Sequence, residues 1–346
     1  MSTLKVAIAG ATGYAGEELI RILLQHPSIQ LTHLAASAKW DRPVALADVF
    51  PRFAGQLDLS VESLDPARLA SSCDVAFLAL PHGVSMDVVP ILLKAGRRIV
   101  DLGSDFRLRD SAAYAQWYGK PHTHPELLAE AVYGIPELSK EAIARARLVA
   151  NPGCYATSII LALAPLLRAK LVEREWMVVD AKSGLTGAGR KAEPSMMFSE
   201  MNENLWPYKV NHHQHTPEVE QALAPFAGAG GVSLCFVPHV VPMNRGILST
   251  MYLRLAKTAT WDDVHATYRD FYREAPFVRL RPQNQWPKIH DVAGTNYCDL
   301  AWTVDQAKRG LIVTAAIDNL LKGAAGQAVQ NLNVMAGWPE TTGLCA

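Results

Sequence analysis

Short apolar runs alternating with amphipathic stretches dominate the first half of the chain. Runs that fit buried parallel strands occupy residues 4–9, 29–35, 74–80, 98–102 and 147–150. Stretches with helical periodicity lie between them, most clearly at residues 17–25 and 85–94. This alternation predicts an α/β fold with a Rossmann-type, doubly wound parallel sheet over residues 1–150.

The pattern changes after a helix predicted over residues 158–170. Longer strands are predicted at residues 176–181, 231–236 and 248–255, typical of a mainly antiparallel sheet. We therefore expect a second, α+β domain over residues 151–316. A last strand at residues 310–317 runs into a helix predicted over residues 318–332, whose small residues permit close packing. Residues 317–346 are expected to return to the first domain.

Composition narrows the classes of partner. The 346 residues carry a formal net charge of zero, so neither nucleic acid nor an anionic membrane has a basic surface to bind. The apolar runs are too short to cross a bilayer, and the first strand begins without a signal peptide. Five scattered cysteines form no C-x-x-C pair, which argues against a disulfide framework or a zinc site. We expect a cytoplasmic protein.

A glycine-rich loop, Gly10-Ala11-Thr12-Gly13-Tyr14-Ala15-Gly16, joins the first strand to the first helix. Glycines in this context let the backbone approach a dinucleotide pyrophosphate at the helix N-terminus, although the G-x-x-G-x-x-G spacing departs from the commoner fingerprint. The alternative is a tight turn without a ligand. The candidate cofactor-binding residues are Gly10, Thr12, Gly13, Tyr14, Ala15 and Gly16.

The second strand ends without the acidic residue that usually holds the ribose 2′-hydroxyl of NAD. Ser37 and Lys39 follow this strand and favour NADP(H), because both are candidate partners of the 2′-phosphate. The alternative is that Lys39 is an exposed loop lysine without this role. Pro81 and His82 begin the loop after the next strand. Such loops face the ligand crevice of a parallel sheet, so we expect both residues to contact the cofactor.

The stretch Asn151-Pro152-Gly153-Cys154 places a thiol between a strand and a helix. Unpaired N–H groups and the helix dipole lower the pKa of a thiol at a helix N-terminus, which predicts a nucleophilic thiolate. The alternative is a small buried hydrophobe.

Histidines follow in Asn211-His212-His213-Gln214-His215-Thr216-Pro217-Glu218. His213 and His215, expected on one face of a strand, lack the cysteine or carboxylate that would complete a metal site. A neutral imidazole acting as general base for Cys154 is the better interpretation. Glu218 is expected to orient that imidazole, or to interact with a helix dipole.

Further polar residues are candidates for anion and cofactor binding. Arg107 has the planar fork that suits a carboxylate or phosphate, with a surface ion pair as the alternative. Residues 183–191 combine three glycines with hydroxyls and a basic pair, and include Ser183, Gly184 and Arg190. The amides of Asn319 and Asn331 either face the cofactor or cap backbone groups, and we favour the first for Asn319.

Taken together, these motifs resemble the N-acetyl-γ-glutamyl-phosphate reductases of arginine biosynthesis, relatives of aspartate-semialdehyde dehydrogenase. The resemblance covers residues 10–333 and is carried by residues 10–16, 105–107, 151–155, 184–190, 213–218 and 322–328. It implies NADPH as reductant, an inserted catalytic and dimerisation domain, and a homodimer or homotetramer. The family's catalytic cysteine falls on Cys154 and its histidine on His215, with His213 as the nearby alternative. Gln214 stands where the family often has Arg.

The resulting hypothesis is an acyl-phosphate reductase. Cys154 attacks the acyl phosphate and expels phosphate, and hydride from NADPH reduces the thioester to a semialdehyde. His215 exchanges the protons, while Arg107, Arg190, His213 and Glu218 are the candidate substrate-binding residues. Alternatives are the same chemistry on carrier-linked aminoadipyl phosphate or aspartyl phosphate, and a non-catalytic NADP sensor. A short-chain reductase would need a Tyr-x-x-x-Lys pair that the sequence lacks.

Overall fold

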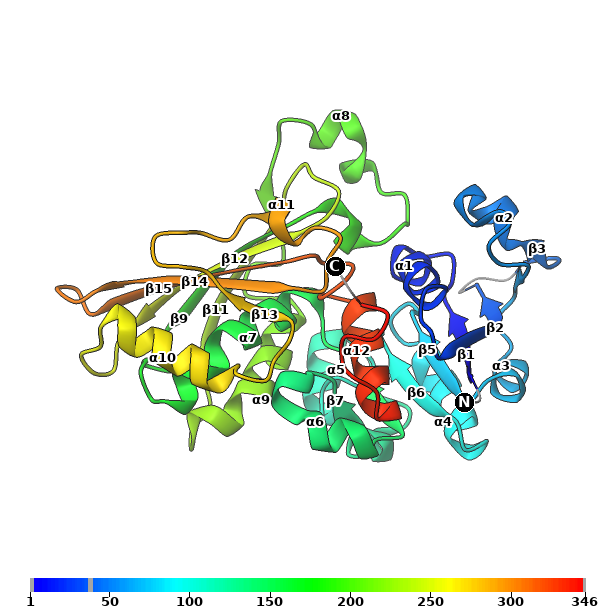
Figure 1. The fold of residues 1–346 in the computed structure, drawn as a ribbon, viewed down its shortest axis with the longest axis horizontal. Helices are drawn as coiled ribbons and strands as arrows, with labels where there is room; N and C mark the ends of the chain where they lie inside the picture. Colours follow the sequence, from blue (N-terminus) through cyan, green and yellow to red (C-terminus); the bar gives the residue numbers. More distant parts are fainter. Residues whose placement is uncertain (1–2, 37–39, 345–346) are drawn as a thin grey trace. The chain divides into compact units, whose positions relative to one another are not determined.

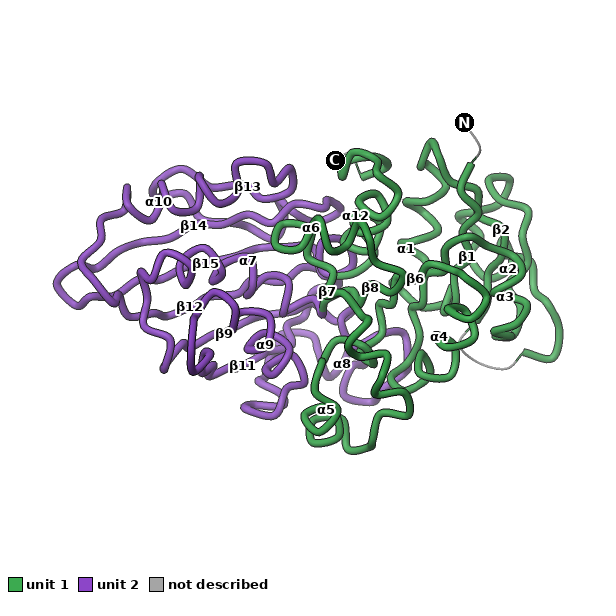
Figure 2. The backbone as a smooth tube through the Cα atoms, turned by 90° about the horizontal axis from the view of Figure 1, so that it is seen from below, with its two compact units in different colours: residues 1–152, 324–345 green, residues 153–323, 346 purple. Residues whose placement is uncertain are grey.

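The structure is a computed structural model that describes residues 3–36 and 40–344. The chain forms two compact units, one of residues 1–152 with 324–345 and one of residues 153–323, coloured separately in Figure 2. The boundaries fall at residues 152/153 and 323/324, whereas the sequence pattern placed domain limits at residues 150 and 317. Ser37 and Lys39 lie outside the described residues.

The first unit is built on a sheet in the order β3-β4-β2-β1-β5-β6-β8-β7. Its strands are β1 (Leu4–Ala9), β2 (Ile29–Ala35), β3 (Val44–Ala45), β4 (Ser60–Glu62), β5 (Val75–Leu78), β6 (Arg98–Asp101), β7 (Val132–Tyr133) and β8 (Leu148–Ala150). All neighbours pair in parallel except β3 with β4. The predicted parallel α/β sheet is confirmed.

Helices of the first unit complete its core. They are α1 (Tyr14–Leu23), α2 (Leu46–Val49), α3 (Pro66–Ser72), α4 (Ser85–Lys94), α5 (Ser111–Tyr118), α6 (Pro136–Arg145) and α12 (Ala325–Ala336), with 3₁₀ turns η1 (Pro51–Phe53) and η2 (Pro125–Leu128). Helix α12 packs against α1 and α6. Because its residues are buried all round, its amide side chains need partners inside the protein.

The second unit contains a mixed sheet in the order β10-β11-β9-β12-β15-β14-β13 (Figure 1). The strands are β9 (Met177–Ser183), β10 (Trp206–Pro207), β11 (Leu234–Val240), β12 (Ile247–Arg254), β13 (Val278–Leu280), β14 (Cys298–Asp305) and β15 (Gly310–Ile317). The pairs β11–β9 and β14–β13 are parallel and the other neighbours antiparallel, as predicted for a mainly antiparallel sheet.

One face of this sheet is covered by helix α7 (Cys154–Arg168), which also contacts α9 (His215–Ala227) and α10 (Trp261–Phe271). Residues buried and half-exposed alternate along β9 and β11, as expected for strands with one covered face. The shorter elements are η3 (Leu185–Ala188), η4 (Pro194–Met196), α8 (Phe198–Met201) and α11 (Ile289–Val292).

Two helix starts differ from the sequence prediction. Helix α7 begins at Cys154, four residues before the apolar pattern used to predict it. The C-terminal helix begins at Ala325, not at Asp318, because the Asp318 carboxylate accepts the backbone N–H groups of Leu320 and Leu321. An aspartate that bonds its own downstream backbone favours a turn over a helix.

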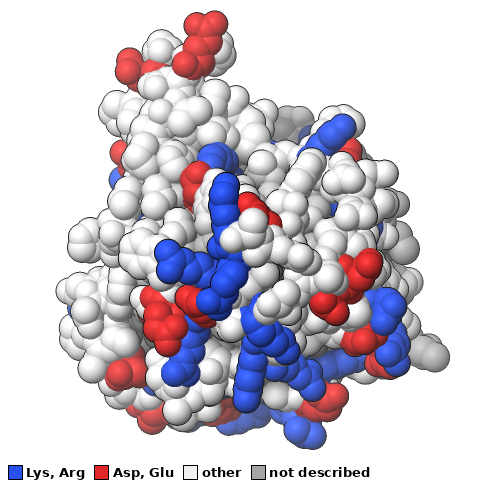
Figure 3. All heavy atoms as spheres, turned by 90° about the vertical axis from the view of Figure 1, so that its left-hand side faces the viewer, with Lys and Arg blue, Asp and Glu red and all other residues white. Residues whose placement is uncertain are grey.

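Charged side chains are mixed on the face of the protein drawn in Figure 3, where a band of Lys and Arg is flanked by Asp and Glu. In the described ranges, no helix has the length and hydropathy needed to span a bilayer. Nor do the described His, Cys, Asp and Glu side chains form a group of three that could hold a metal ion.

Candidate active site

Cys154 is the first residue of α7, with Gly153 as N-cap and no side chain capping the helix. Its partly buried side chain lines a cavity of about 560 Å³ in the second unit. The same cavity is lined by His213, His215, Ser183 and Gly184. The structure therefore brings five of the residues singled out from the sequence to one place, at a helix end whose N–H groups favour negative charge.

The His215 imidazole lies against the backbone just before the cysteine. A Cβ atom added at Gly153 would lie 2.2 Å from His215 Nε2, so only glycine lets the ring approach this closely. The Gly153 N–H donates to Glu218 Oε1 at 2.7 Å, and Glu218 Oε2 lies 4.0 Å from His215 Nε2. Glu218 is fully buried and bound to the loop before Cys154. A carboxylate placed in this way can stabilise a protonated imidazole.

His213 is not on a strand with His215, because it lies in the bend before α9 and His215 is in the helix. Their rings meet edge to face with centroids 4.6 Å apart, and Tyr155 and Tyr208 contact His213 in the same manner. Burial is the main cause that lowers the pKa of His213 to about 2, and the neighbouring His215 lowers it further. His213 Nδ1 accepts the backbone N–H of His215. With its pKa lowered this far, His213 is a poor proton acceptor near pH 7.

The three glycines in the loop of the first unit differ in how closely the backbone packs against them. Gly10 has φ +86°, and a Cβ there would lie 2.0 Å from the Ala79 oxygen; at Gly16 it would lie 2.2 Å from the Gly10 oxygen. Gly13 is different, because its nearest neighbour would be 3.5 Å away. Gly13 also caps α1 without any side-chain hydrogen bond. The loop therefore fits a dinucleotide pyrophosphate, with two glycines needed by the fold and one open to the ligand.

The loop after β5 is fixed by Asp105, which lies in a motif marked in the sequence but was given no role there. The Gly83 N–H donates to both carboxylate oxygens of Asp105, and His82 Nδ1 lies 2.9 Å from Oδ1. The His82 ring also stacks on Tyr118 at 4.5 Å, and burial lowers its pKa. Pro81 is exposed at the start of this loop. Asp105 itself is fully buried, so the loop that we expect to contact the cofactor has a rigid base.

Arg107 is buried rather than part of a surface ion pair, so that alternative is wrong. Its Nε donates to the Asn151 oxygen at 2.9 Å and its Nη2 to the Leu102 oxygen at 2.8 Å. Two of the partners that hold the guanidinium are therefore backbone carbonyls. Such a cation is suited to binding an anionic ligand.

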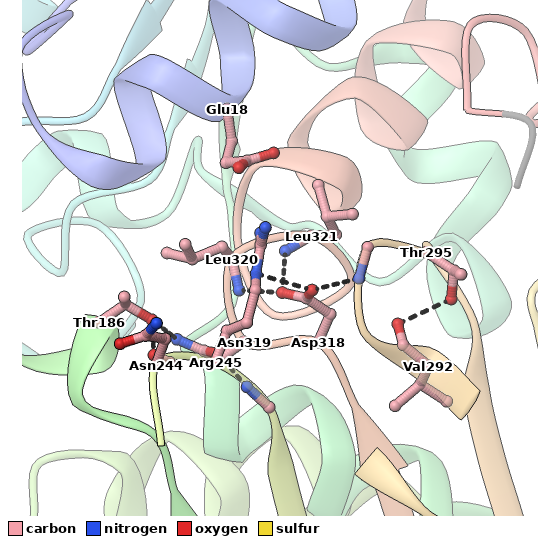
Figure 4. Close-up of polar contacts among 12 residues, drawn as sticks. Glu18, Thr186, Asn244, Arg245, Val292, Thr295, Asp318, Asn319, Leu320 and Leu321 are labelled. Atoms are coloured by element: carbon pink, nitrogen blue, oxygen red, sulfur yellow. Dashed lines mark hydrogen bonds and ion pairs between the residues drawn. The ribbon is translucent and has the colours of Figure 1, made fainter. Parts of the chain in front are cut away.

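The loop at residues 183–191 is attached to the turn after β15 (Figure 4). Asn319 Nδ2 donates to Thr186 Oγ1 at 2.9 Å, and Asn319 Oδ1 accepts the Gly246 N–H at 2.6 Å. Fully buried Asp318 pairs with Arg245 at 3.0 Å. The amide of Asn319 therefore bonds one backbone group and one side chain of the loop. Arg190 is exposed and is not among the residues lining the cavity.

Some residues of the cavity carried no recognisable signal in the sequence. Trp206, Tyr208 and Lys209 line it from a segment without periodicity, and Lys209 Nζ donates to Gln214 Oε1 at 2.9 Å. Gly323 packs against the nucleophile, since a Cβ at this position would lie 2.8 Å from the Cys154 Cβ. Only Gly323 lies in a motif that the sequence analysis had marked.

Comparisons with known proteins agree with this geometry. Residues 5–146 match the model described as semialdehyde dehydrogenase, NAD binding domain, and residues 154–319 match semialdehyde dehydrogenase, dimerisation domain. The N-acetyl-gamma-glutamyl-phosphate reductase of Symbiobacterium thermophilum is 50% identical, covering 99% of this chain and 97% of its own. That of Desulforudis audaxviator is also 50% identical, covering 99% and 98%.

Among solved structures, aspartate semialdehyde dehydrogenase II from Vibrio cholerae superposes with a TM-score of 0.74 at 19% identity, covering 97% of this chain and 99% of that one. At that identity the likeness shows the fold. A dinucleotide-binding unit combined with a cysteine–histidine cavity defines an oxidoreductase of the semialdehyde dehydrogenase type. Within that class, the chain belongs to the N-acetyl-gamma-glutamyl-phosphate reductase family.

Proposed function

We propose that this protein reduces N-acetyl-γ-glutamyl phosphate to N-acetylglutamate 5-semialdehyde with NADPH, through a thioester on Cys154. The observation that carries this proposal is the position of Cys154 at the start of α7, in a cavity shared with His215. The relatives that match nearly the whole chain bear the name of this reductase.

Cys154 is the nucleophile. His215 takes the thiol proton, and the Cys154 thiolate forms a bond to the acyl carbon while the bond to phosphate breaks and inorganic phosphate leaves. Backbone N–H groups at the start of α7 stabilise the oxyanion of each tetrahedral intermediate. His215 gives its proton to the departing phosphate. After the thioester is reduced, the carbon–sulfur bond of the tetrahedral intermediate breaks, the aldehyde carbonyl forms and Cys154 leaves as the thiolate. Glu218 orients this imidazole and stabilises its protonated form.

The glycine loop would hold the cofactor, and Thr12, Gly13, Tyr14 and Ala15 are the residues that would bind its pyrophosphate. When bound, NADPH supplies the hydride that reduces the Cys154 thioester. We assign Ser37 and Lys39 to the 2′-phosphate, and Pro81, His82, Ser183, Gly184 and Asn319 to the cofactor site as well. Arg107 and Arg190 are assigned to the substrate's anionic groups, with His213 as a neutral donor in the cavity wall. Lys209 is a further cation in this wall.

We also propose a cytoplasmic homodimer, with a homotetramer as the other state. The sheet face not covered by α7 carries the ion pairs of Asp180 with Lys182 and with His239, together with 45% exposed Tyr252. This mixed surface suits pairing with a second copy. The described cysteines are free thiols, as expected in a reducing compartment. Sedimentation of wild type and Tyr252→Arg tests the interface: the variant should dissociate, and an unchanged dimer would refute the assignment.

The reaction is tested in reverse, with purified enzyme, phosphate and NADP. N-acetylglutamate semialdehyde should be oxidised at least a hundredfold more efficiently than aspartate semialdehyde or carrier-linked aminoadipate semialdehyde. If the enzyme prefers either of the other two semialdehydes, the assigned substrate is wrong but the assigned reaction stands. Binding of NADP without oxidation of any of the three would support a sensor and contradict the proposal.

A further inference from the structure

Asn151 begins the motif that carries Cys154, and the hydrogen-bond partners of its backbone and side chain lie in the first unit. Its backbone N–H donates to the Asp101 oxygen, and its backbone oxygen accepts Arg107 Nε. The amide nitrogen donates to the Ala324 oxygen at 3.2 Å, which leaves the amide oxygen as an acceptor. Asn151 is fully buried, so protein atoms alone determine its position.

The group that meets this amide oxygen is Asn331, 180 residues further along the chain on α12. Asn331 Nδ2 donates to Asn151 Oδ1 at 3.0 Å and to the Gly134 oxygen at 2.9 Å. Both acceptors are oxygens, so the amide of Asn331 has only one favourable orientation. The fit is close, because a Cβ at Gly134 would lie 2.4 Å from Asn331 Nδ2.

We propose that Asn331 is a positioning residue for substrate binding: by fixing Asn151, it sets the place of the carbonyl that holds the Arg107 guanidinium. This inference rests on the proposed function, in which Arg107 binds an anionic group of the acyl phosphate. The Arg107 guanidinium donates to the oxygens of Asn151 and Leu102, and Asn331 supports the first of these acceptors. Loss of that support lets the guanidinium move relative to the substrate, and misplacement of a binding group weakens the complex.

Helix α12 offers a matched control. Asn333 is also fully buried and also donates two hydrogen bonds, but to the oxygens of Glu340 and Thr342. Its amide oxygen meets His26 Nε2. Asn333→Ala therefore removes the same chemical groups from the same helix without touching Asn151. A role limited to stabilising the fold would make the two variants equivalent.

The experiment compares Asn331→Ala, Asn333→Ala, Arg107→Ala and the Asn331→Ala/Arg107→Ala double variant. Asn331→Ala should raise the KM for the acyl phosphate about tenfold, leave kcat and the Kd for NADPH within about twofold, and add little in the Arg107→Ala background. Asn333→Ala should leave this KM unchanged. Asn331→Ser keeps one hydroxyl donor, so its KM for the acyl phosphate should lie between those of the wild type and Asn331→Ala. If Asn331→Ala does not fold, the same measurements are made on Asn331→Ser.

Two negative outcomes are distinguishable. If Arg107→Ala leaves the KM for the acyl phosphate unchanged, the substrate-binding assignment of Arg107 fails, and the inference fails with it. If Arg107→Ala raises KM but the effect of Asn331→Ala equals that of Asn333→Ala, or adds fully to that of Arg107→Ala, then Asn331 is only structural and the proposed function stands.

Discussion

Replacing Gly153 with alanine should uncouple His215 from Cys154 while leaving the backbone in place. Gly153 has φ −69° and ψ 151°, which alanine adopts without strain. The new methyl group would meet the His215 ring, with 2.2 Å to Nε2, 2.5 Å to Cε1 and 2.7 Å to Cδ2. The shortest separation is about 1.2 Å below the 3.4 Å at which ordinary contact begins, so the ring must withdraw by about that distance.

A displacement of this size has a larger effect on catalysis than on stability. Misplacing a catalytic group by about 1 Å lowers the rate by about a hundredfold, or about 2.7 kcal/mol in activation free energy. The ring is the free end of a side chain, so we expect only about 1 kcal/mol loss in the free energy of unfolding. Steady-state kcat and the rate of Cys154 alkylation measure the effect on the active site, and urea unfolding measures the effect on stability.

Gly310→Ala is the control for Gly153→Ala. Its Cβ would meet only the Asp305 Cβ at 3.7 Å, an ordinary contact at the start of β15. It should leave kcat and alkylation unchanged. A folded Gly153→Ala enzyme with wild-type kcat would refute the assignment of His215 as the base acting from its observed position.

Three further predictions concern the remaining groups of the second unit and the thiols. His213 stays neutral in the folded protein down to about pH 2, whereas the unfolded chain binds a proton below about 6.5, so stability falls as pH falls below 6.5. Between pH 7 and pH 5, the free energy of unfolding should therefore fall by about 2 kcal/mol less in His213→Gln than in the wild type. Urea unfolding at pH 7 and at pH 5 measures this difference, and an equal fall in both proteins would contradict the prediction. At pH 8, iodoacetamide should modify Cys154 long before Cys73, since burial raises the pKa of Cys73 to about 11; mass spectrometry showing Cys73 modified first would be inconsistent with this. Asp318→Asn should lower the free energy of unfolding by about 3 kcal/mol, because Arg245 loses its buried partner, and an unchanged melting temperature would exclude a structural role for this pair.

The sequence predicts the first sheet well for a physical reason. The predicted residues 4–9 and 29–35 are β1 and β2 without a shift. In β1, residues 6–9 are buried and appear in the sequence as an uninterrupted apolar run, as expected for a central parallel strand. Strand β11 is less well predicted, because Pro238 and His239 interrupt its apolar pattern and it runs to Val240, not Phe236. Its position between β10 and β9 also depends on pairing that local periodicity does not encode.

The site was predictable where chemistry and local structure coincide. Cys154 follows a turn and begins a helix, and both features are visible in adjacent residues. His213 and His215 could not be distinguished in this way, since the difference between them is burial. The link between Asn151 and Asn331 is likewise invisible, because it joins side chains 180 residues apart.

Single-turnover trapping of the acyl enzyme tests the role of Cys154 most directly. Without NADPH, mixing the enzyme with acyl phosphate should release one equivalent of phosphate per subunit and add the acyl mass to the peptide that carries Cys154. NADPH should then remove the adduct, and Cys154→Ala should show neither burst nor adduct while binding NADPH with unchanged affinity. Turnover by Cys154→Ala, or reduction by the wild type without any adduct on Cys154, would contradict the account.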